Sequence, residues 1–539
     1  MAGIEVHGDA RGERGDEAQR PGSDDRRPPG RVWAFRGLGL ALAALTWLSL
    51  GGAEGLEPAG RIVAAIGVLM ATWWMTEAIP LSATALVPIV AFPAFGVLSV
   101  SDATSPYANP IVFLFLGGFL IAIAMQKWHL HRRIALLTMR AVGTHPRRIV
   151  LGMMIATSFV SMWVSNTATT LMMLPIALSV LSVVVERTRT GVDAHPDRPA
   201  IEKGRTISDT VDDPAVKIFG VGLVLSIAWA ASIGGLGTLL GSPPNAIVAG
   251  YVSEQLDREL GFLAWMQLGV PIVVVFIAVT WLLITRVLFR SDLDEIPGGR
   301  EMISGQLAEM GPIGRGEKLV LAVFASAAFL WIVPGLVSNI AAVDTAAPWL
   351  GSLNDTAIAV GAGIALFLLP AERGSRRMVL QWEDAQQGLP WGVLLLFGGG
   401  LSLAGAVAGS GLDAWIGSRV EVLGVLPVIL LVAAVVTLIV FLTEITSNTA
   451  TAATFIPVLG GVAIGVGADS VTLLVPAALA ATCAFMLPVA TPPNAIVFGS
   501  GTVTIAQMAR GGILLNAVGV LVITVFSWLL GGWALGLRF

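Results

Sequence analysis

The stretches 165–175 (SNTATTLMMLP) and 447–457 (SNTATAATFIP) decide the fold of this 539-residue chain. Both begin with SNTAT, and both place a proline ten residues after the serine. A second pair follows in the same order, GSPPNAIV at 241–248 and ATPPNAIV at 490–497. Two paired motifs in one order indicate an internal repeat, which is the first feature to seek in a sequence.

The composition indicates a membrane protein. Hydrophobic residues make up 55% of the chain and charged residues only 13%, whereas soluble domains have roughly 45–50% and about 25%. This excludes an ordinary soluble enzyme and a disordered scaffold. The net charge of −4 gives no basic field to attract nucleic acid. A single cysteine excludes a disulfide framework and a thiolate metal cluster.

Apolar runs long enough to cross a bilayer recur along the chain, since about 20 helical residues span its hydrocarbon core. We expect spans near 34–53, 60–79, 81–99, 110–126, 218–250 (broken), 262–285, 318–338, 355–370, 389–408, 470–500 (broken) and 512–535. The stretches 149–185 and 425–463 are each nearly two spans long and carry a polar cluster at the middle. Each is therefore predicted to be a re-entrant hairpin, which enters the membrane and returns.

The polar segments predict how the chain is oriented. Residues 1–32 should form a disordered cytoplasmic tail, and 186–217 and 286–318 charge-rich loops. In 127–148, basic and apolar residues alternate at helical spacing, which predicts an amphipathic helix at the membrane surface. The positive-inside rule then predicts a multi-pass protein of the cell (inner) membrane with a cytoplasmic N-terminus and an outside C-terminus.

The two halves match once the polar loop 186–217 is removed from the first. Each half then has five spans and one hairpin, and the odd number predicts opposite orientations. We therefore predict an all-α integral membrane protein with about eleven transmembrane helices plus two re-entrant hairpins in two inverted-topology repeats. The predicted parts are a first transmembrane helix at 33–59, a first repeat at 60–290, a cytoplasmic linker at 291–317 and a second repeat at 318–539. This architecture is typical of secondary transporters, with the site at the midplane.

The SNT triplets supply hydroxyl and amide groups at the predicted hairpin tips. An asparagine can offer its oxygen to a cation and its N–H groups to an anion. A helix that begins at the tip presents free N–H groups, which suit an anion. The alternative is that Ser and Thr only cap and pack the hairpin helices. The symmetric placement of the two triplets favours a binding role.

The PPN elements are predicted to break two spans at corresponding depths. Proline cannot continue the helical hydrogen bonds, so it frees carbonyl groups upstream. Those carbonyls suit a hard monovalent cation. Asn245 and Asn494 are expected to cap the half-helices that follow. A plain proline kink is the alternative.

Two cation cages can be assembled from these residues, because the hydroxyl residues Ser161 and Thr443 precede the motif serines by one helical turn. The first cage would combine Ser161, Ser165 and Asn166 with the Gly241 carbonyl. The second would combine Thr443, Asn448 and the carbonyls of Thr446 and Ala490. Glu444 lies near the second cage, as a functional carboxylate or as a hydrogen-bonded structural one.

The predicted hairpins and the second break contain no basic residue: 149–185 and 420–509 have no Lys, Arg or His. An anion at the midplane would therefore need positive charge from helix ends and bound ions. Sodium is the expected coupling ion, because the ligands are neutral oxygens. Protons are less favoured, because no histidine or carboxylate cluster is present to carry them.

The doubled SNT motif, the paired PPN breaks and TEAIPLSATALVP (Thr76 to Pro88) resemble the divalent anion/sodium symporter (DASS) family over about residues 33–539. The resemblance implies a bacterial di-/tricarboxylate transporter that works as an elevator-type homodimer. It implies sodium ligands at Ser161, Ser165, Asn166 and Gly241, and at Thr443, Thr446, Asn448 and Ala490. It implies substrate contacts at Ser165, Asn166, Thr167, Ser242, Pro243, Ser447, Asn448, Thr449, Thr491 and Pro492.

From these observations we expect a non-enzymatic, sodium-coupled importer of C4 dicarboxylates such as succinate, fumarate or malate. It should need no organic cofactor, no catalytic residue and no nucleic acid, and should act in the lipid bilayer. Three transporters of the same fold remain open: a sodium-independent dicarboxylate exchanger, a tricarboxylate exchanger and a sodium/sulfate symporter. A membrane enzyme would need a nucleophile–base pair or a metal cluster, and a channel would not need two inverted hairpins.

Overall fold

A computed structural model describes residues 29–143, 145–188, 213–291, 293, 299–337, 354–372 and 377–539. Most of the expected N-terminal tail and of the loop 186–217 lies outside these residues. The described residues are almost wholly helical, and their one β feature is an isolated bridge between Pro370 and Met378. Ten of the described helices are long and apolar enough to cross a membrane. The predicted all-α membrane architecture is therefore confirmed.

The helices follow the same order twice. The first set is α2 (Pro58–Thr76), α3 (Leu81–Thr84), α4 (Val87–Ala94), α5 (Val100–Thr104), α6 (Pro110–Lys127), α7 (Leu130–Val142), α8 (Pro146–Ser161), α9 (Asn166–Thr188), α11 (Pro214–Gly234), α12 (Pro243–Leu256) and α13 (Phe262–Leu282). The second set is α15 (Arg315–Val337), α17 (Asp355–Leu368), α18 (Trp382–Gly388), α19 (Trp391–Gly409), α20 (Leu412–Val420), α21 (Val428–Thr443), α22 (Asn448–Gly465), α23 (Ser470–Ala481), α24 (Pro492–Gly499) and α25 (Ile505–Leu535). Outside the sets lie α1 (Pro29–Ser49) and α14 (Gly299–Glu309).

The two hairpins and the two broken spans lie where the motifs place them. Helices α8 and α9 meet at residues 162–165, and α21 and α22 meet at residues 444–447. The broken spans are α11 with α12 and α23 with α24, and in each pair the second helix begins at the first proline of PPN. Proline is well suited to this first position, where a helical N–H has no partner to lose.

The bases of the two hairpins lie at opposite ends of α13. At its carboxyl end, Trp281 Nε1 donates to the Arg147 carbonyl at the start of α8. Just before its amino end, Arg258 forms an ion pair with Asp469, which follows α22. The hairpins therefore enter from opposite faces, as an inverted repeat requires.

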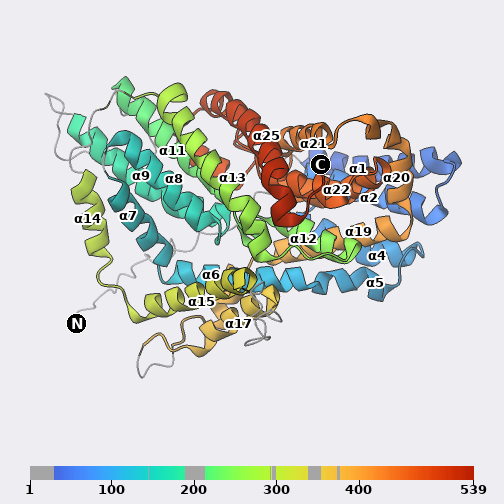
Figure 1. Cartoon of the computed structure of the whole chain (residues 1–539), viewed down its shortest axis with the longest axis horizontal. Coiled ribbons are helices and arrows are strands. Elements are labelled where there is room, and N and C mark those ends of the chain that lie inside the picture. The colour runs from blue at the N-terminus through green and yellow to red at the C-terminus, as the bar shows by residue number, and fades with distance from the viewer. Residues whose placement is uncertain are drawn as a thin grey trace, which may run out of the picture.

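Figure 1 shows how the two sets are arranged along the long axis of the molecule. Helices α7, α8, α9 and α11 lie toward one end, α20 and α22 lie toward the other, and α12, α13 and α25 lie between them.

Glycines allow close contacts between helices at both ends of the molecule. A Cβ at Gly234 of α11 would overlap the Ser158 backbone of α8, and one at Gly465 of α22 would overlap Gly417 of α20.

Two segments differ from what the sequence patterns predict, and a third agrees with its prediction. The span expected at 81–99 is broken into α3 and α4, because Pro88 cannot donate the helical hydrogen bond that would join them. The segment 286–318 is not simply a loop, since it contains the helix α14. The amphipathic helix expected within 127–148 is present as α7, whose Arg133 pairs with Glu317 of α15 at 2.5 Å.

Candidate functional site

A central cavity of about 990 Å³ lies where the two hairpin tips meet the two helix breaks. The expected site residues that line it are Ser165, Asn166, Thr167, Gly241, Ser242, Pro243, Thr446, Ser447, Asn448, Thr449, Ala490, Thr491 and Pro492. The remaining two, Ser161 and Thr443, are fully buried and hydrogen-bonded to Asn166 and Asn448. One cavity thus brings together residues that are more than 300 positions apart in the sequence.

The first oxygen cluster forms where the first hairpin tip meets α11. Ser161 Oγ lies 2.6 Å from Asn166 Oδ1 and 2.8 Å from the Ala231 carbonyl oxygen. That same end of the Asn166 amide is 3.1 Å from the Ala231 oxygen and 3.2 Å from the Gly241 oxygen. A half turn of the amide would place its N–H groups there instead, and they would donate to both carbonyls and to Ser161.

The second cluster repeats the two hydroxyl contacts of the first. Thr443 Oγ1 lies 2.8 Å from Asn448 Oδ1 and 2.9 Å from the Ala481 carbonyl oxygen. The hydroxyl of Thr446 is used elsewhere, because it donates to Leu442 and pairs with Thr451. Only the main chain of Thr446 is therefore available to a ligand.

When the Asn166 oxygen faces Ser161, both clusters hold more acceptor atoms than protons; the half turn of the Asn166 amide would remove this excess from the first cluster. A hydroxyl group has one proton, so Ser161 and Thr443 can each donate to only one of their two oxygen neighbours at a time. Each remaining oxygen–oxygen contact needs another positive partner. Hydroxyl, amide and carbonyl oxygens are also ligands that suit a hard cation. The chemistry of the two clusters therefore fits a small metal cation.

The cavity suits an anion because helix N-termini, and not basic residues, supply its positive charge. Helices α9, α12, α22 and α24 all begin at residues that line it. Their N-termini carry partial positive charge. Among the described lining residues, Glu77 is the one charged side chain. An anion in the cavity would therefore meet helix N-termini, hydroxyls and amides, but no Lys, Arg or His.

The expected capping role of Asn245 and Asn494 is wrong. Both occupy the third helical position, and the cap positions belong to Ser242 and Thr491. Thr491 Oγ1 accepts a hydrogen bond from the Asn494 main-chain N–H. The asparagine side chains turn back instead, where each donates two hydrogen bonds to carbonyls of the preceding break. They hold the shape of the non-helical segment, whose carbonyls need such partners.

Glu444 at the second hairpin tip is buried and fully hydrogen-bonded. Its carboxylate accepts from the main-chain N–H groups of residues 485, 486 and 487 at 2.7–3.2 Å. It also accepts from Asn516 Nδ2 of α25 at 2.8 Å. These contacts tie the hairpin tip to the second break, so Glu444 positions the second cluster and does not face the cavity.

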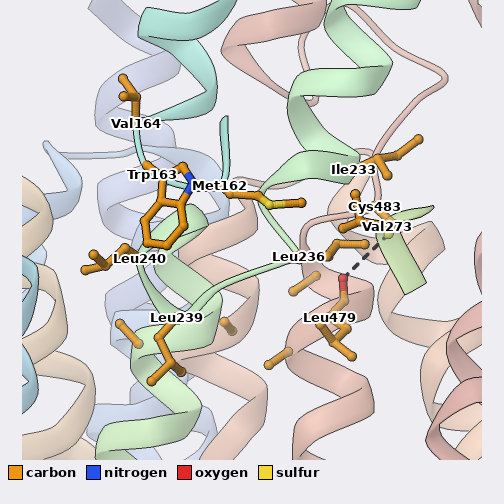
Figure 2. Close-up of a cluster of buried hydrophobic side chains, with 14 of the residues drawn as sticks. Met162, Trp163, Val164, Ile233, Leu236, Leu239, Leu240, Val273, Leu479 and Cys483 are labelled. Carbon is orange, nitrogen blue, oxygen red and sulfur yellow. Dashed lines mark hydrogen bonds between the residues drawn. The ribbon is translucent and has the colours of Figure 1, made fainter. Parts of the chain in front are cut away.

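The first hairpin tip is held by apolar packing instead. Met162 occupies the position that corresponds to Glu444, and it packs in a buried cluster with Trp163, Leu239 and Leu240 (Figure 2). Figure 2 also shows Cys483 of the second break within this cluster. The Thr238 hydroxyl adds one hydrogen bond, to the Met162 carbonyl. The two oxygen clusters thus have similar oxygen atoms, but the hairpin tips that carry them are held by different contacts.

Two hydroxyl residues at this site were not predicted. Thr482 lies after α23 and pairs with the hydroxyl of Ser242 across the two breaks, at 2.9 Å. Ser232, near the end of α11, lines the cavity. In the sequence, each is a single small polar residue in an apolar helix end, a pattern that most often means packing.

A family model described as "Sodium:sulfate symporter transmembrane region" matches residues 33–535. Among curated proteins, the sodium-dependent dicarboxylate transporter SdcS of Staphylococcus saprophyticus is 41% identical over 497 residues, 92% of this chain and 90% of the relative. SdcS of Staphylococcus aureus is 41% identical over 465 residues, 86% of this chain and 84% of the relative.

Two solved structures share the fold at low sequence identity. The YdaH transporter of Alcanivorax borkumensis aligns with a TM-score of 0.56 and 14% identity, over 94% of this chain and 99% of that one. MtrF of Neisseria gonorrhoeae aligns with a TM-score of 0.52 and 13% identity, over 93% and 95%. These likenesses support the fold alone.

Proposed function

The chain belongs to the sodium:sulfate symporter family, and from this premise we propose that it is a sodium-coupled symporter that imports C4 dicarboxylates such as succinate, fumarate or malate. It is a multi-pass membrane transporter and not an enzyme. The names of its 41%-identical relatives support both sodium coupling and the dicarboxylate substrate.

The two oxygen clusters are the observation that carries the proposal. In each, one hydroxyl proton is shared between two acceptors at 2.6–2.9 Å. Sodium bound to either cluster would supply the missing positive partner. Sodium would also hold the oxygen of Asn166 toward Gly241 and Ala231, where the structure has it, and leave the amide N–H groups for the substrate.

The charge balance explains why transport should be coupled. A dicarboxylate carries two negative charges into a cavity whose described lining has no basic residue. Leaving such a charge unpaired inside the membrane costs several kcal/mol. Sodium ions bound in the two oxygen clusters, which contain Asn166 and Asn448, would offset that cost. The substrate should therefore bind well only when sodium is bound.

We assign the following roles within the proposal. Sodium would bind at Ser161, Ser165, Asn166 and Gly241 and at Thr443, Thr446, Asn448 and Ala490. The substrate carboxylates would bind the two SNT triplets, the hydroxyls of Ser242 and Thr491, and the helix N-termini at Pro243 and Pro492. The assignment is supported by the cavity, which these residues line except Ser161 and Thr443, and by the hydrogen bonds of those two to Asn166 and Asn448.

Orientation, domain boundaries and assembly complete the proposal. Arg147 lies at the base of the first hairpin, on the face that also receives the end of α13, and this basic face would be cytoplasmic. Arg538 donates its main-chain N–H to Thr472 near the start of α23, beside the opposite face, so the C-terminus would lie outside. The repeats would span 60–290 and 318–539. We propose an inner-membrane homodimer in which the hairpins move as an elevator.

Uptake into proteoliposomes tests the proposal. Radiolabelled succinate should accumulate when an inward sodium gradient is applied, and should not accumulate when choline replaces sodium. Unlabelled dicarboxylates, tricarboxylates and sulfate then compete at equal concentration, and dicarboxylates should compete best. Undiminished uptake in choline would favour an exchanger. Stronger competition by sulfate would favour a sodium/sulfate symporter.

A further inference from the structure

Ser232 is a buried hydroxyl residue beside the proposed substrate site that has no assigned role. It is 1% exposed and lies near the carboxyl end of α11. Its Oγ atom has no hydrogen-bond partner among the described residues. Its side chain also lines the central cavity. Other described buried hydroxyls, such as those of Thr280 and Ser527, also lack a partner, but Ser232 is the one of this group that lines the cavity. Because most buried polar groups are hydrogen-bonded, its position there points to a ligand as the missing partner.

The inverted repeat supplies an internal comparison for Ser232. The carbonyls of Ala231 and Ala481 accept from the hairpin hydroxyls of Ser161 and Thr443, and the next residues are Ser232 and Thr482. Ser232 and Thr482 therefore occupy corresponding positions. Thr482 is paired with Ser242 at 2.9 Å and does not line the cavity. The same interaction is missing for Ser232.

Thr491 is the residue that would complete the second pair. It corresponds to Ser242, and its hydroxyl oxygen accepts from the Asn494 N–H. No hydrogen bond joins Thr491 to Ser232 in the described structure, although both line the cavity. The hydroxyls of Ser242 and Thr482 are thus paired with each other, whereas those of the corresponding residues Thr491 and Ser232 are not.

We propose that Ser232 Oγ donates a hydrogen bond to a carboxylate of the bound substrate and is a further substrate-binding residue. The inference rests on the proposed function. Ser232 is assigned to the anion rather than to sodium because the cluster of Ser161, Asn166, Ala231 and Gly241 offers oxygen ligands for a cation without it. The described cavity lining has no basic side chain, so the anion needs each available hydroxyl proton.

The test measures initial rates of succinate uptake into proteoliposomes at saturating sodium, and separately the sodium concentration for half-maximal uptake. Ser232→Ala removes the hydroxyl, and Ser232→Cys keeps nearly the same volume with a weak S–H donor. Both should raise the KM for succinate by about tenfold, the usual order for a hydrogen bond to a charged group. The maximal rate and the sodium dependence should stay unchanged.

Ser226→Ala is the matched control, because Ser226 is equally buried on α11 but bonds to the Leu223 carbonyl of its own helix. It should leave the KM unchanged. A wild-type KM in Ser232→Ala or Ser232→Cys would overturn the inference, as would a shift in sodium dependence without a shift in succinate KM. If the wild-type protein shows no sodium-dependent succinate uptake, the proposed function fails and the inference fails with it.

Discussion

Asn245 and Asn494 make the same two hydrogen bonds in the two halves of the molecule. Each donates from Nδ2 to the carbonyls ten and seven residues before it, at 2.8–3.1 Å. Both side chains are fully buried. One asparagine in each repeat therefore fixes the non-helical backbone that leads to the substrate-facing hydroxyls of Ser242 and Thr491.

Replacing either of these asparagines by alanine should destabilise the protein and abolish uptake. Asn245→Ala and Asn494→Ala each remove two hydrogen bonds. The Gly235 and Ala484 carbonyls would lose their partner, whereas those of Thr238 and Leu487 also accept from main-chain N–H groups. The expected cost is about 2–5 kcal/mol. Thermal unfolding of purified protein in detergent, followed by size-exclusion chromatography, should show a clearly lower melting temperature for both variants.

The control for this prediction is Thr437→Ala, whose hydroxyl only bonds back to the Ala433 carbonyl of its own helix. Its melting temperature should stay within a few degrees of the wild type. If the two asparagine variants have the same melting temperature as Thr437→Ala, the asparagines do not stabilise the helix breaks.

The architecture could be predicted from sequence because its signals are local and repeated. SNTAT and PPNAIV mark the hairpin tips and breaks directly. The proline that starts α12 or α24 interrupts helical hydrogen bonding whatever its tertiary surroundings. The direction of the Asn245 side chain could not be predicted. An asparagine beside a helix start can cap that helix or donate to carbonyls of the preceding segment, and the sequence is the same in both cases. Its true partners, Gly235 and Thr238, are carbonyl groups that any residue would supply.

Variants in the oxygen clusters should separate sodium binding from folding. Ser161→Ala and Thr443→Val remove one hydroxyl oxygen from each cluster, and should raise the sodium concentration for half-maximal uptake by about tenfold, equivalent to about 1.4 kcal/mol. Asn166→Ala and Asn448→Ala should abolish concentrative uptake altogether, because these residues would face both sodium and substrate. Uptake measured across a sodium titration checks both expectations.

Thr157→Ala is the matched control for the first cluster. Thr157 lies one turn before Ser161 on α8, is fully buried, and bonds only to the Met153 carbonyl. Its sodium titration should match the wild type. Wild-type rates in Asn166→Ala and Asn448→Ala would refute the assignment of the clusters.

Glu444 should be required for the stability of the protein. Glu444→Gln places an amide N–H₂ group where one carboxylate oxygen accepts main-chain N–H groups, so donors would face donors. We expect a loss of about 3–5 kcal/mol, the range for removing one partner of a buried charged network. Glu421→Gln, at an exposed position, should not change the melting temperature. Equal melting of the two variants would contradict the positioning role.

The role of Glu444 and the presence of Ser232 in the cavity could not be predicted from the sequence for a common reason. The partners of Glu444 are 41–43 and 72 residues away, so only the fold brings them together. Ser232 differs from a packing serine because it lines the cavity and its hydroxyl has no partner among the described residues. Such contacts depend on tertiary geometry rather than on any local pattern.

The most direct measurement is equilibrium binding of radiolabelled succinate to the purified wild-type protein in detergent, titrated with sodium at constant ionic strength. We expect negligible binding when choline is the only cation, and saturable binding that tightens as sodium is added. Equal affinity for succinate in choline and in sodium would contradict the claim that sodium supplies the positive charge that the cavity lacks.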